Sequence, residues 1–564
     1  MDAEPAATGR SRHHLGDFTV DRRVIPIGLI ACAIGVVCAG VAFALLRLIA
    51  IFTNLFYYGR LAAALASPAG NHLGALAVLV PVAGGVIVGL MARYGSERIK
   101  GHGIPEALEA ILTRGSRVEP RVAILKPLSA AISIGSGGPF GAEGPIIVTG
   151  GAFGSLIAQR FHLTAAERKT LLVSGAAAGM AATFATPVAA TLLAVELLLF
   201  EWKPRSFIPV AAASAMAAAL RPFLLGSGPL FPTPPLAAPA SAAALLACVP
   251  MGLAAGIFGA LLTQAVYAAE DAFPKFRIHW MWWPAIGGVI VGLGGLVSPR
   301  ALGVGYDVIA DLLAGRMAIH LVVALLLVKA TIWSISLGSG TSGGVLAPLL
   351  MVGAALGTVA GLVLPHEGVA FWPLVGMAAI LGAAMGVPFT AIVFSLELTH
   401  DVNMLPPLLI AVLMSYAFVV LALRRSILTE KIDRRGFHIS REYATDPLEL
   451  LFVHEVMSRD PVHLAVTPRE GNFVHPDEPL TRVVNRMAVS GRTELLVVER
   501  DDVTRPVGWV SLEHLLEARA RHVEEERQRD GTVPLSLVVP SWLLRKARRR
   551  TSTREARPRS ADRR

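Results

Sequence analysis

Long runs of apolar residues alternate with short polar segments along most of the chain. Four of these runs approach or exceed the length needed to cross a hydrocarbon core of about 30 Å: residues 24–52, 73–91, 242–266 and 320–337. The first run is longer than the core of a signal peptide and has no obvious cleavage site before it, so we interpret it as a retained span. The pattern therefore predicts an all-α polytopic membrane protein.

Glycine and proline repeatedly interrupt the apolar runs, and some runs are too short to span a bilayer. Such broken helices are typical of a transporter or channel core. Polarity changes abruptly near residue 424, and a small α/β domain is expected beyond it. The expected domains are a polar leader (1–23), a membrane domain (24–425), a linker (426–449), a small soluble domain (450–520) and a basic tail (521–564).

Composition and charge agree with a bilayer environment. Hydrophobic residues make up 54% of the chain, charged residues 16%, and the mean hydropathy is +0.59. Residues 545–564 hold ten Lys or Arg against two acidic residues. The positive-inside bias places that end, and with it the leader, in the cytoplasm. For the tail we prefer a solvated end or attraction to anionic lipid over nucleic-acid binding.

The cysteine pattern excludes two classes of site. Cys32, Cys38 and Cys248 all lie within apolar segments, so the sequence predicts neither a disulfide framework nor a cysteine-based metal site. No other complete metal-ligand motif is present, and we expect neither a metal nor a cofactor.

The membrane domain contains an internal duplication, with repeats at about residues 24–225 and 240–425. Apolar low complexity can mimic one matched element, but hardly several in one order at nearly one offset. Duplicated halves with interrupted segments at corresponding places indicate a substrate site between the repeats. The matched elements are 101–108 with 303–309, 126–145 with 329–348, and Pro187/Glu196 with Pro388/Glu397, at offsets of 202, 203 and 201.

Three glycine-rich loops, at residues 101–105, 135–145 and 338–348, each lie before or beside an apolar run. The first turn of a helix has unpaired N–H groups and a partial positive charge, so it can hold an anion without a cationic side chain. Glycines let the backbone approach the ion, and partial charges release it readily. Close helix packing is the usual alternative for one such loop, but three loops with the same pattern favour anion binding.

Glu143 lies in the second loop, where its repeat partner is the apolar Leu346. A carboxyl group at membrane depth is costly and points to function. At an anion site it can compete with the anion and leave when protonated. We therefore predict that Glu143 is a gate and a proton carrier; the alternative is a carboxylate facing bulk water at the edge of a loop.

Two other charged pairs are duplicated. Glu196 and Glu397 occupy equivalent positions in the two repeats, which favours a shared structural role, such as binding a helix end or a positive partner, although Glu196 also remains a candidate proton relay. Lys126 and Lys329 are either counter-charges that attract anions or side chains that extend to the membrane interface.

The sequences GHGIP (101–105), GAEGP (141–145) and GGVLAP (343–348) together resemble the three selectivity motifs of the CLC chloride channel and transporter family. The resemblance covers nearly the whole membrane domain. It implies an inverted-repeat fold, a homodimer with one pore per subunit, and a bacterial-type inner or plasma membrane. It also implies that Glu143 is the external gate. The anion contacts implied are Gly101, His102, Gly103, Ile104, Pro105, Gly141, Gly144, Pro145, Ile146, Gly344, Val345 and Leu346.

The chain departs from the family pattern at three positions. His102 replaces the usual central-site serine, and Leu428 stands where a pore tyrosine is expected. The inner proton-transfer acid of bacterial exchangers falls at Leu197. As a neutral donor His102 can coordinate an anion; alternatively it turns aside to line a cytoplasmic vestibule.

The segment from residue 453 resembles a CBS domain, with a helix at 480–489, strands at 494–498 and 506–510, and a helix from residue 512. Little more than one such module is present, so pairing across the dimer is plausible. No glycine-rich phosphate loop supports nucleotide binding.

We predict gated passive conduction of chloride or a similar small anion. Loss of the acid at Leu197 favours this over proton-coupled antiport, although Glu196, Glu201 or water could still relay protons. A membrane-embedded hydrolase using Glu143 and His102 is a remote alternative, because no nucleophile accompanies them. The chain is therefore not expected to be an enzyme.

Overall fold

The computed structural model describes residues 22–236, 238–423, 426–434, 448, 451–460, 473–500, 502 and 505–529. Backbone contacts divide the chain into two units, Met1–Arg441 and Glu442–Arg564, and each is described by itself. The predicted leader, linker and basic tail lie mostly outside the described residues.

The described part of the first unit is built from helices, seven of which are long and apolar enough to cross a membrane. Each of the four long apolar runs identified in the sequence lies inside one of these seven to within one residue, so the long apolar helices predicted there are confirmed. The candidate spans are Val24–Tyr58, Gly74–Tyr94, Pro204–Leu225, Ala242–Lys275, Trp280–Val297, Ile319–Gly338 and Val402–Arg434.

Shorter apolar helices lie between these spans, as the glycine and proline interruptions predicted. Four of them are Pro187–Leu199, Leu346–Ala360, Phe371–Met385 and Pro388–Thr399. Proline at the first turn of a helix costs no hydrogen bond, because that N–H has no partner within the helix. Pro187 and Pro388 each begin their helix in this way.

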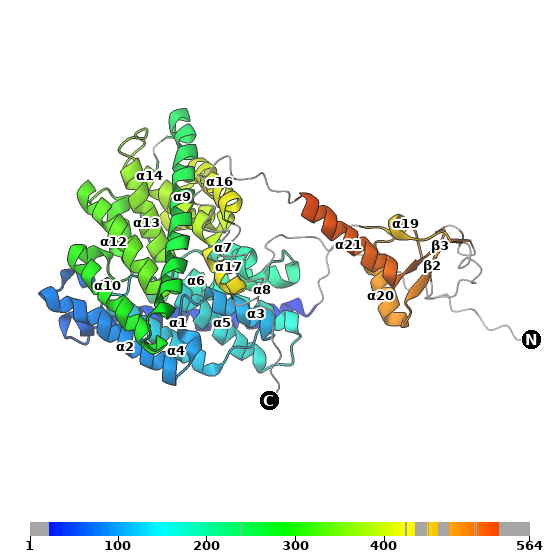
Figure 1. Cartoon of the computed structure of the whole chain (residues 1–564), viewed down its shortest axis with the longest axis horizontal. Coiled ribbons are helices and arrows are strands. Elements are labelled where there is room, and N and C mark those ends of the chain that lie inside the picture. The colour runs from blue at the N-terminus through cyan, green and yellow to red at the C-terminus, as the bar shows by residue number, and fades with distance from the viewer. Residues whose placement is uncertain are drawn as a thin grey trace, which may run out of the picture. The chain divides into compact units, whose positions relative to one another are not determined.

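Within the described residues the first half has eight α-helices, the second has eight in the same order, and α17 follows as an addition to the second half. Figure 1 colours the first half from blue to blue-green and the second from green to yellow. The first half holds α1 (Val24–Tyr58), η1 (Pro68–Gly70), η2 (Gly74–Val78), α2 (Leu79–Tyr94), η3 (Glu97–Ile99), α3 (Ile104–Thr113), α4 (Pro120–Gly135), α5 (Glu143–Gln159), α6 (Ala165–Phe184), α7 (Pro187–Leu193), the π-helix η4 (Ala194–Leu199) and α8 (Pro204–Leu225). The second holds α9 (Ala242–Ala272), η5 (Phe273–Lys275), η6 (Trp280–Trp282), α10 (Trp283–Val297), η7 (Pro299–Ala301), α11 (Tyr306–Leu313), α12 (Ile319–Gly338), α13 (Leu346–Ala360), α14 (Phe371–Met385), α15 (Pro388–Thr399), η8 (Val402–Met404), α16 (Leu405–Ala422) and α17 (Ile427–Arg434).

Contacts between the halves are reciprocal. Gly141 and Gly344, which are repeat equivalents, pair with each other as an antiparallel bridge, with N–H···O distances of 2.9 and 3.3 Å. The N–H of Gly101 donates to Gly340 at 3.3 Å, and the N–H of Gly303 donates to Gly137 at 3.1 Å. These contacts from the first half to the second thus have counterparts in the other direction. This is what a two-fold relation between the halves produces, with the Gly141–Gly344 pair at its axis.

Glycines in the helix interiors let neighbouring helices approach closely. A Cβ on Gly175 of α6 would lie 2.1 Å from the carbonyl oxygen of Gly150 on α5. A Cβ on Gly353 of α13 would lie 2.6 Å from the carbonyl oxygen of Gly376 on α14. These glycines serve helix packing, and they are distinct from the loop glycines that precede α3, α5 and α13.

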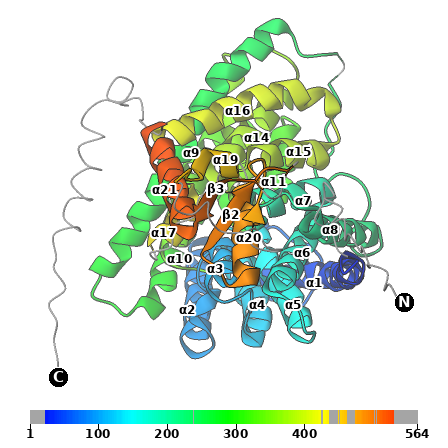
Figure 2. The same ribbon diagram turned by 90° about the vertical axis from the view of Figure 1, so that its right-hand side faces the viewer.

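The second unit is a small α/β module, as predicted (Figure 2). Strand β2 pairs parallel with β1 and antiparallel with β3, and one face of the sheet contributes to a core with α20 and α21. The sequence missed the short elements α19 and β1. The elements are α19 (Val453–Val456), β1 (Phe473–Val474), α20 (Leu480–Ser490), β2 (Glu494–Val498), β3 (Pro506–Ser511) and α21 (Leu512–Arg529).

Candidate functional site

Four helices begin at repeat-equivalent residues around the paired glycine loops. α3 begins at Ile104 and its equivalent α11 at Tyr306; α5 begins at Glu143 and its equivalent α13 at Leu346. The bridges described above join the loops before these helices into one network. The first-turn N–H groups of the helices therefore gather near the axis between the halves, where they can stabilise negative charge.

Glu143 is fully buried at the first position of α5. Its Oε1 accepts a hydrogen bond from the hydroxyl of Tyr306 at 3.3 Å. Its Oε2 lies 2.7 Å from the place that a Cβ on Gly344 would take, next to the first turn of α13. No donor among the described residues is hydrogen-bonded to Oε2. The carboxylate thus lies between the starts of α5 and α13, where those helix ends favour an anion.

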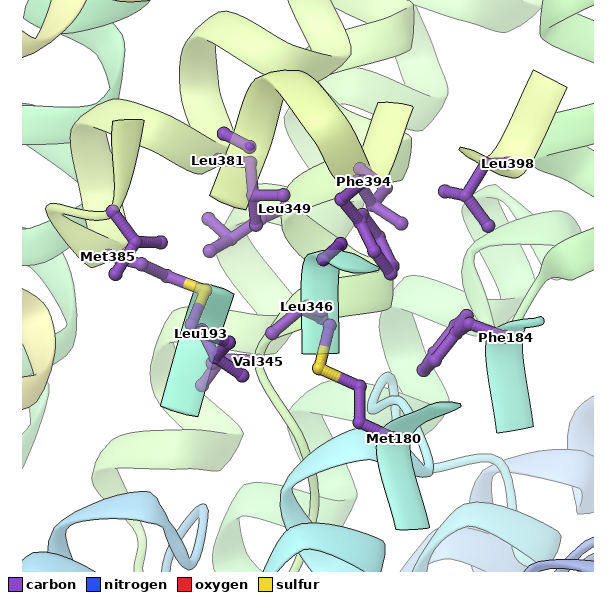
Figure 3. Close-up of a cluster of buried hydrophobic side chains, with 14 of the residues drawn as sticks. Met180, Phe184, Leu193, Val345, Leu346, Leu349, Leu381, Met385, Phe394 and Leu398 are labelled. Carbon is purple, nitrogen blue, oxygen red and sulfur yellow. The ribbon is translucent and has the colours of Figure 1, made fainter. Parts of the chain in front are cut away.

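The side chains at the start of α13 turn into the apolar core. Val345 and Leu346 lie among side chains of α6, α7, α14 and α15, as Figure 3 shows. An anion at this place would therefore meet the backbone of α13 and not these side chains. The labelled neighbours are Met180, Phe184, Leu193, Leu349, Leu381, Met385, Phe394 and Leu398.

The loop before α3 is pressed against α5. Gly101 and Gly103 have φ values of 76° and 91°, which favour glycine. A Cβ on Gly144 would lie 2.0 Å from the carbonyl oxygen of His102, so only glycine fits there. His102 is buried, with 3% of its surface exposed. The structure therefore brings the first and second motifs together, and the Gly141–Gly344 bridge adds the third.

A lysine of α17, Lys431, lies beside the first motif (residues 101–105). The Nζ of Lys431, on α17, is 3.3 Å from Glu106 Oε1 and 2.5 Å from the place of a Cβ on Gly101. Both residues line a cavity of about 430 Å³ together with Lys100, Trp280 and Gly340. This cavity gives polar access to the residues next to the first motif.

Leu428 is fully buried on α17, three residues before Lys431. The neighbouring carbonyl oxygen, that of Ile427, accepts a hydrogen bond from the hydroxyl of Tyr267 on α9. A tyrosine hydroxyl is therefore present beside this segment, although it comes from another helix and is bonded to the backbone.

The two duplicated lysines are buried and hold equivalent loops. Lys126 Nζ donates to the carbonyl oxygens of Ile99 and Gly101 at 2.8 and 2.7 Å. Lys329 Nζ donates to those of Ala301 and Gly303 at 2.9 and 3.0 Å. Both side chains are fully buried, so neither extends to a membrane interface. Each lysine fastens the loop before α3 or α11 through two backbone carbonyl groups.

The duplicated acids bind helix ends reciprocally. Glu196, in the π-helix η4, accepts hydrogen bonds from the backbone N–H groups of Phe389 and Thr390 at the start of α15, at 3.1 and 2.8 Å. Glu397, on α15, accepts from the N–H groups of Val188 and Ala189 at the start of α7, at 3.0 and 2.8 Å. Leu197, beside Glu196, is buried and apolar.

Sequence reasoning did not place Tyr306 at the site. A signal was present: Tyr306 is the repeat equivalent of Ile104, so a hydroxyl-bearing residue stands where the other half has an apolar one. This is the same kind of asymmetry that distinguishes Glu143 from Leu346. The contact itself joins residues 163 positions apart.

Comparisons with known proteins agree with this architecture. Residues 84–420 match the voltage gated chloride channel family, and residues 453–521 match the CBS domain. A voltage-gated ClC-type chloride channel, ClcB, of Salmonella typhi is 31% identical over 343 residues, which cover 59% of this chain and 82% of that protein. The ClcB protein of Escherichia coli is 30% identical over 344 residues, covering 59% and 81%.

Two solved structures share the fold. A slow cyanobacterial Cl⁻/H⁺ antiporter matches with a TM-score of 0.62 and 20% identity over 74% of this chain and 98% of that chain. A CLC-type fluoride/proton antiporter matches with a TM-score of 0.60 and 21% identity over 73% and 98%. At these identities the likeness concerns the fold.

Proposed function

Because the chain belongs to the voltage gated chloride channel (CLC) family, we propose that it carries chloride or a similar small anion across a membrane, with Glu143 as the gate. The observation that supports this most directly is the buried carboxylate of Glu143 between the starts of α5 and α13. Members of this family are channels and transporters, so the protein is not an enzyme and the hydrolase alternative is wrong.

In the proposed mechanism the Glu143 carboxylate and the transported anion compete for one place. Helix N-termini stabilise either negative charge. Protonation removes the charge of the side chain, which weakens its hold on the helix ends and lets an anion replace it. Because the helix ends carry only partial charges, the anion is bound weakly enough to move on.

The inner part of the path would start at the loop of the first motif. We propose that the buried His102 acts there as a neutral donor to the anion, in place of the family's serine. The amino groups of Lys126, which holds this loop, and of Lys431, beside Gly101 and paired with Glu106, attract anions when they are protonated.

We favour passive conduction over proton-coupled antiport. Leu197 offers no proton-accepting group, and Glu196 is engaged with the start of α15. Glu201, the other acid that could relay protons, accepts a hydrogen bond from the Ser206 hydroxyl at 2.7 Å and is likewise engaged. Two observations keep antiport as the second candidate: Glu143 can carry a proton, and both solved structures named above are antiporters that couple an anion to protons.

Proteoliposomes distinguish the two modes. A chloride gradient is imposed, and both chloride flux and external pH are recorded. Passive conduction predicts chloride flux without uphill proton movement, whereas protons driven uphill by chloride would establish antiport. The Glu143→Ala variant should conduct chloride without protons in either case. If neither the wild type nor this variant conducts any small anion, the transport assignment itself is wrong.

We further propose a homodimer in a bacterial-type inner membrane, with both termini cytoplasmic and the CBS domains of two subunits paired. Apolar side chains are exposed at the starts of α7 and α15, where Val188 and Phe389 are 55% and 60% exposed. Large exposed apolar surface marks contact with lipid or with another subunit. Cross-linking of cysteines introduced at these two positions would test the dimer, and a monomer in the membrane would contradict it.

A further inference from the structure

The hydroxyl of Tyr306 is the side-chain donor that the structure places against the gate. It lies 3.3 Å from Glu143 Oε1. A tight bond between a hydroxyl and a carboxylate measures about 2.5–2.7 Å. The hydroxyl is therefore within reach of the carboxylate but is not locked to it, so the two groups can separate without a large rearrangement.

The position of Tyr306 is closely defined by its surroundings. The ring makes edge contacts with Phe184 and Phe231, with centroids 6.0 and 6.1 Å away. Gly305, the residue before it, has a φ of 74°, and a Cβ there would lie 2.0 Å from Cε of Met351 on α13. The start of α11 is thus pressed against α13, and the ring has little freedom to move away from the gate.

The hydroxyl of Tyr306 has no equivalent in the first repeat. At the equivalent position the other half has Ile104, which is fully buried. Tyr306 is partly buried and packs against the apolar core, where a phenol hydroxyl is costly unless it has a hydrogen-bond acceptor. In this structure the acceptor is the Glu143 carboxylate. When the gate opens, that acceptor leaves and an anion arrives.

We propose that the Tyr306 hydroxyl is an anion ligand of the outer site, shared in turn by the Glu143 carboxylate and the transported anion. In the closed state it positions the gate, and in the open state it donates its hydrogen bond to the anion. In the family a serine and a tyrosine usually contact the central anion, and here these positions hold His102 and Leu428. The Tyr306 hydroxyl would therefore provide a side-chain contact to the anion at the outer site instead of the central one. The inference rests on the proposed function and names one more ligand of the same site.

The binding test uses the Glu143→Ala background, in which only the anion can accept the hydrogen bond. Chloride affinity is measured by isothermal titration calorimetry on purified protein, with and without Tyr306→Phe. A hydrogen bond to a charged group corresponds to roughly a tenfold or larger change in an equilibrium constant. We therefore expect the dissociation constant for chloride to rise about tenfold.

Tyr57→Phe is the matched control. Tyr57 is buried, and its hydroxyl donates to the carbonyl oxygen of Ser136 at 3.0 Å, so the substitution removes one buried hydroxyl without touching the gate. Chloride affinity should not change in this variant. An unchanged affinity in the Tyr306 variant, or an equal loss in the Tyr57 variant, would overturn the proposal.

The gating test keeps Glu143. Tyr306→Phe should raise chloride flux at neutral pH by a few fold, because the carboxylate loses a hydrogen bond that holds it in place. Flux equal to or below that of the wild type, in protein that elutes from gel filtration like the wild type, would contradict the positioning role. If neither the wild type nor Glu143→Ala binds or conducts any small anion, the proposed function fails first. If both do and Tyr306→Phe alters neither affinity nor flux, only this inference fails.

Discussion

The two halves of the membrane unit share one framework but differ at the first residues of their central helices. The first half begins α3 with Ile104 and α5 with Glu143, whereas the second begins α11 with Tyr306 and α13 with Leu346. The two-fold relation therefore sets a polar pair, Glu143 and Tyr306, against an apolar pair, Leu346 and Ile104. The framework gathers helix ends from both halves, but the polar pair, which includes the proposed gate Glu143, comes from one residue position in each half that is apolar in the other.

Replacing Lys126 or Lys329 is expected to cause the largest loss of stability, and it tests whether the two halves hold their loops in the same way. Lys329→Met would remove the donor to two buried carbonyl groups, those of Ala301 and Gly303, and Lys126→Met would remove it from Ile99 and Gly101, of which Gly101 also accepts from the N–H of Gly343 at 3.4 Å. At about 1–3 kcal/mol for each carbonyl group left unpaired, the two variants should lose roughly 1–6 kcal/mol of stability, measured by thermal or denaturant unfolding in detergent. Losses of similar size would support equivalent roles, and a loss in only one variant would break the comparison.

Glu143 and Leu346 test the difference between the halves. If protonation of Glu143 opens the gate, wild-type chloride flux should rise as pH falls, by at most about tenfold per pH unit for one proton. Glu143→Gln carries no charge and should give high flux with little pH dependence. Leu346→Met preserves side-chain volume and should keep the wild-type pH profile. A steep profile in Glu143→Gln would show that another group controls the gate.

Alanine substitutions at helix-packing glycines test whether the helices of the two halves pack equally closely. Gly175→Ala and Gly353→Ala place a methyl group 2.1 and 2.6 Å from a backbone oxygen of the neighbouring helix. We expect each to cost about 1–3 kcal/mol of stability from overpacking. Gly40 of α1 has open space around it, so Gly40→Ala should be neutral or slightly stabilising. Unfolding midpoints would rank the three variants, and a loss in Gly40→Ala equal to the others would refute the packing argument.

The acid pair has the smallest expected effect. Glu196→Gln and Glu397→Gln keep one oxygen acceptor but remove the charge that complements a helix N-terminus, a change of about 0.5–2 kcal/mol. Similar small losses of stability with unchanged chloride flux would indicate a structural role for both acids. A specific loss of proton movement in Glu196→Gln, measured with a pH electrode on proteoliposomes, would instead identify Glu196 as a relay and revive antiport.

Much of the fold was predictable because its signals are local. Apolar runs, glycine and proline interruptions and the near-constant offset between repeats indicated the spans, the broken helices and the duplication. The asymmetry between Glu143 and Leu346 was visible from the repeat alone. The short elements α19 and β1 were missed, since a two-residue strand and a four-residue helix carry almost no periodic signal.

Other properties depended on which distant segments meet. The sequence left Lys126 as either a counter-charge or an interface side chain, and its hydrogen bonds to Ile99 and Gly101 exclude the interface. It favoured a structural role for Glu196, at a helix end or with a positive partner, without deciding between the two. It contained Tyr306 in the repeat but not its contact with Glu143, across 163 residues. Hydrophobic periodicity determines which residues leave water, whereas the partner of a buried polar group is decided only when the two halves pack together.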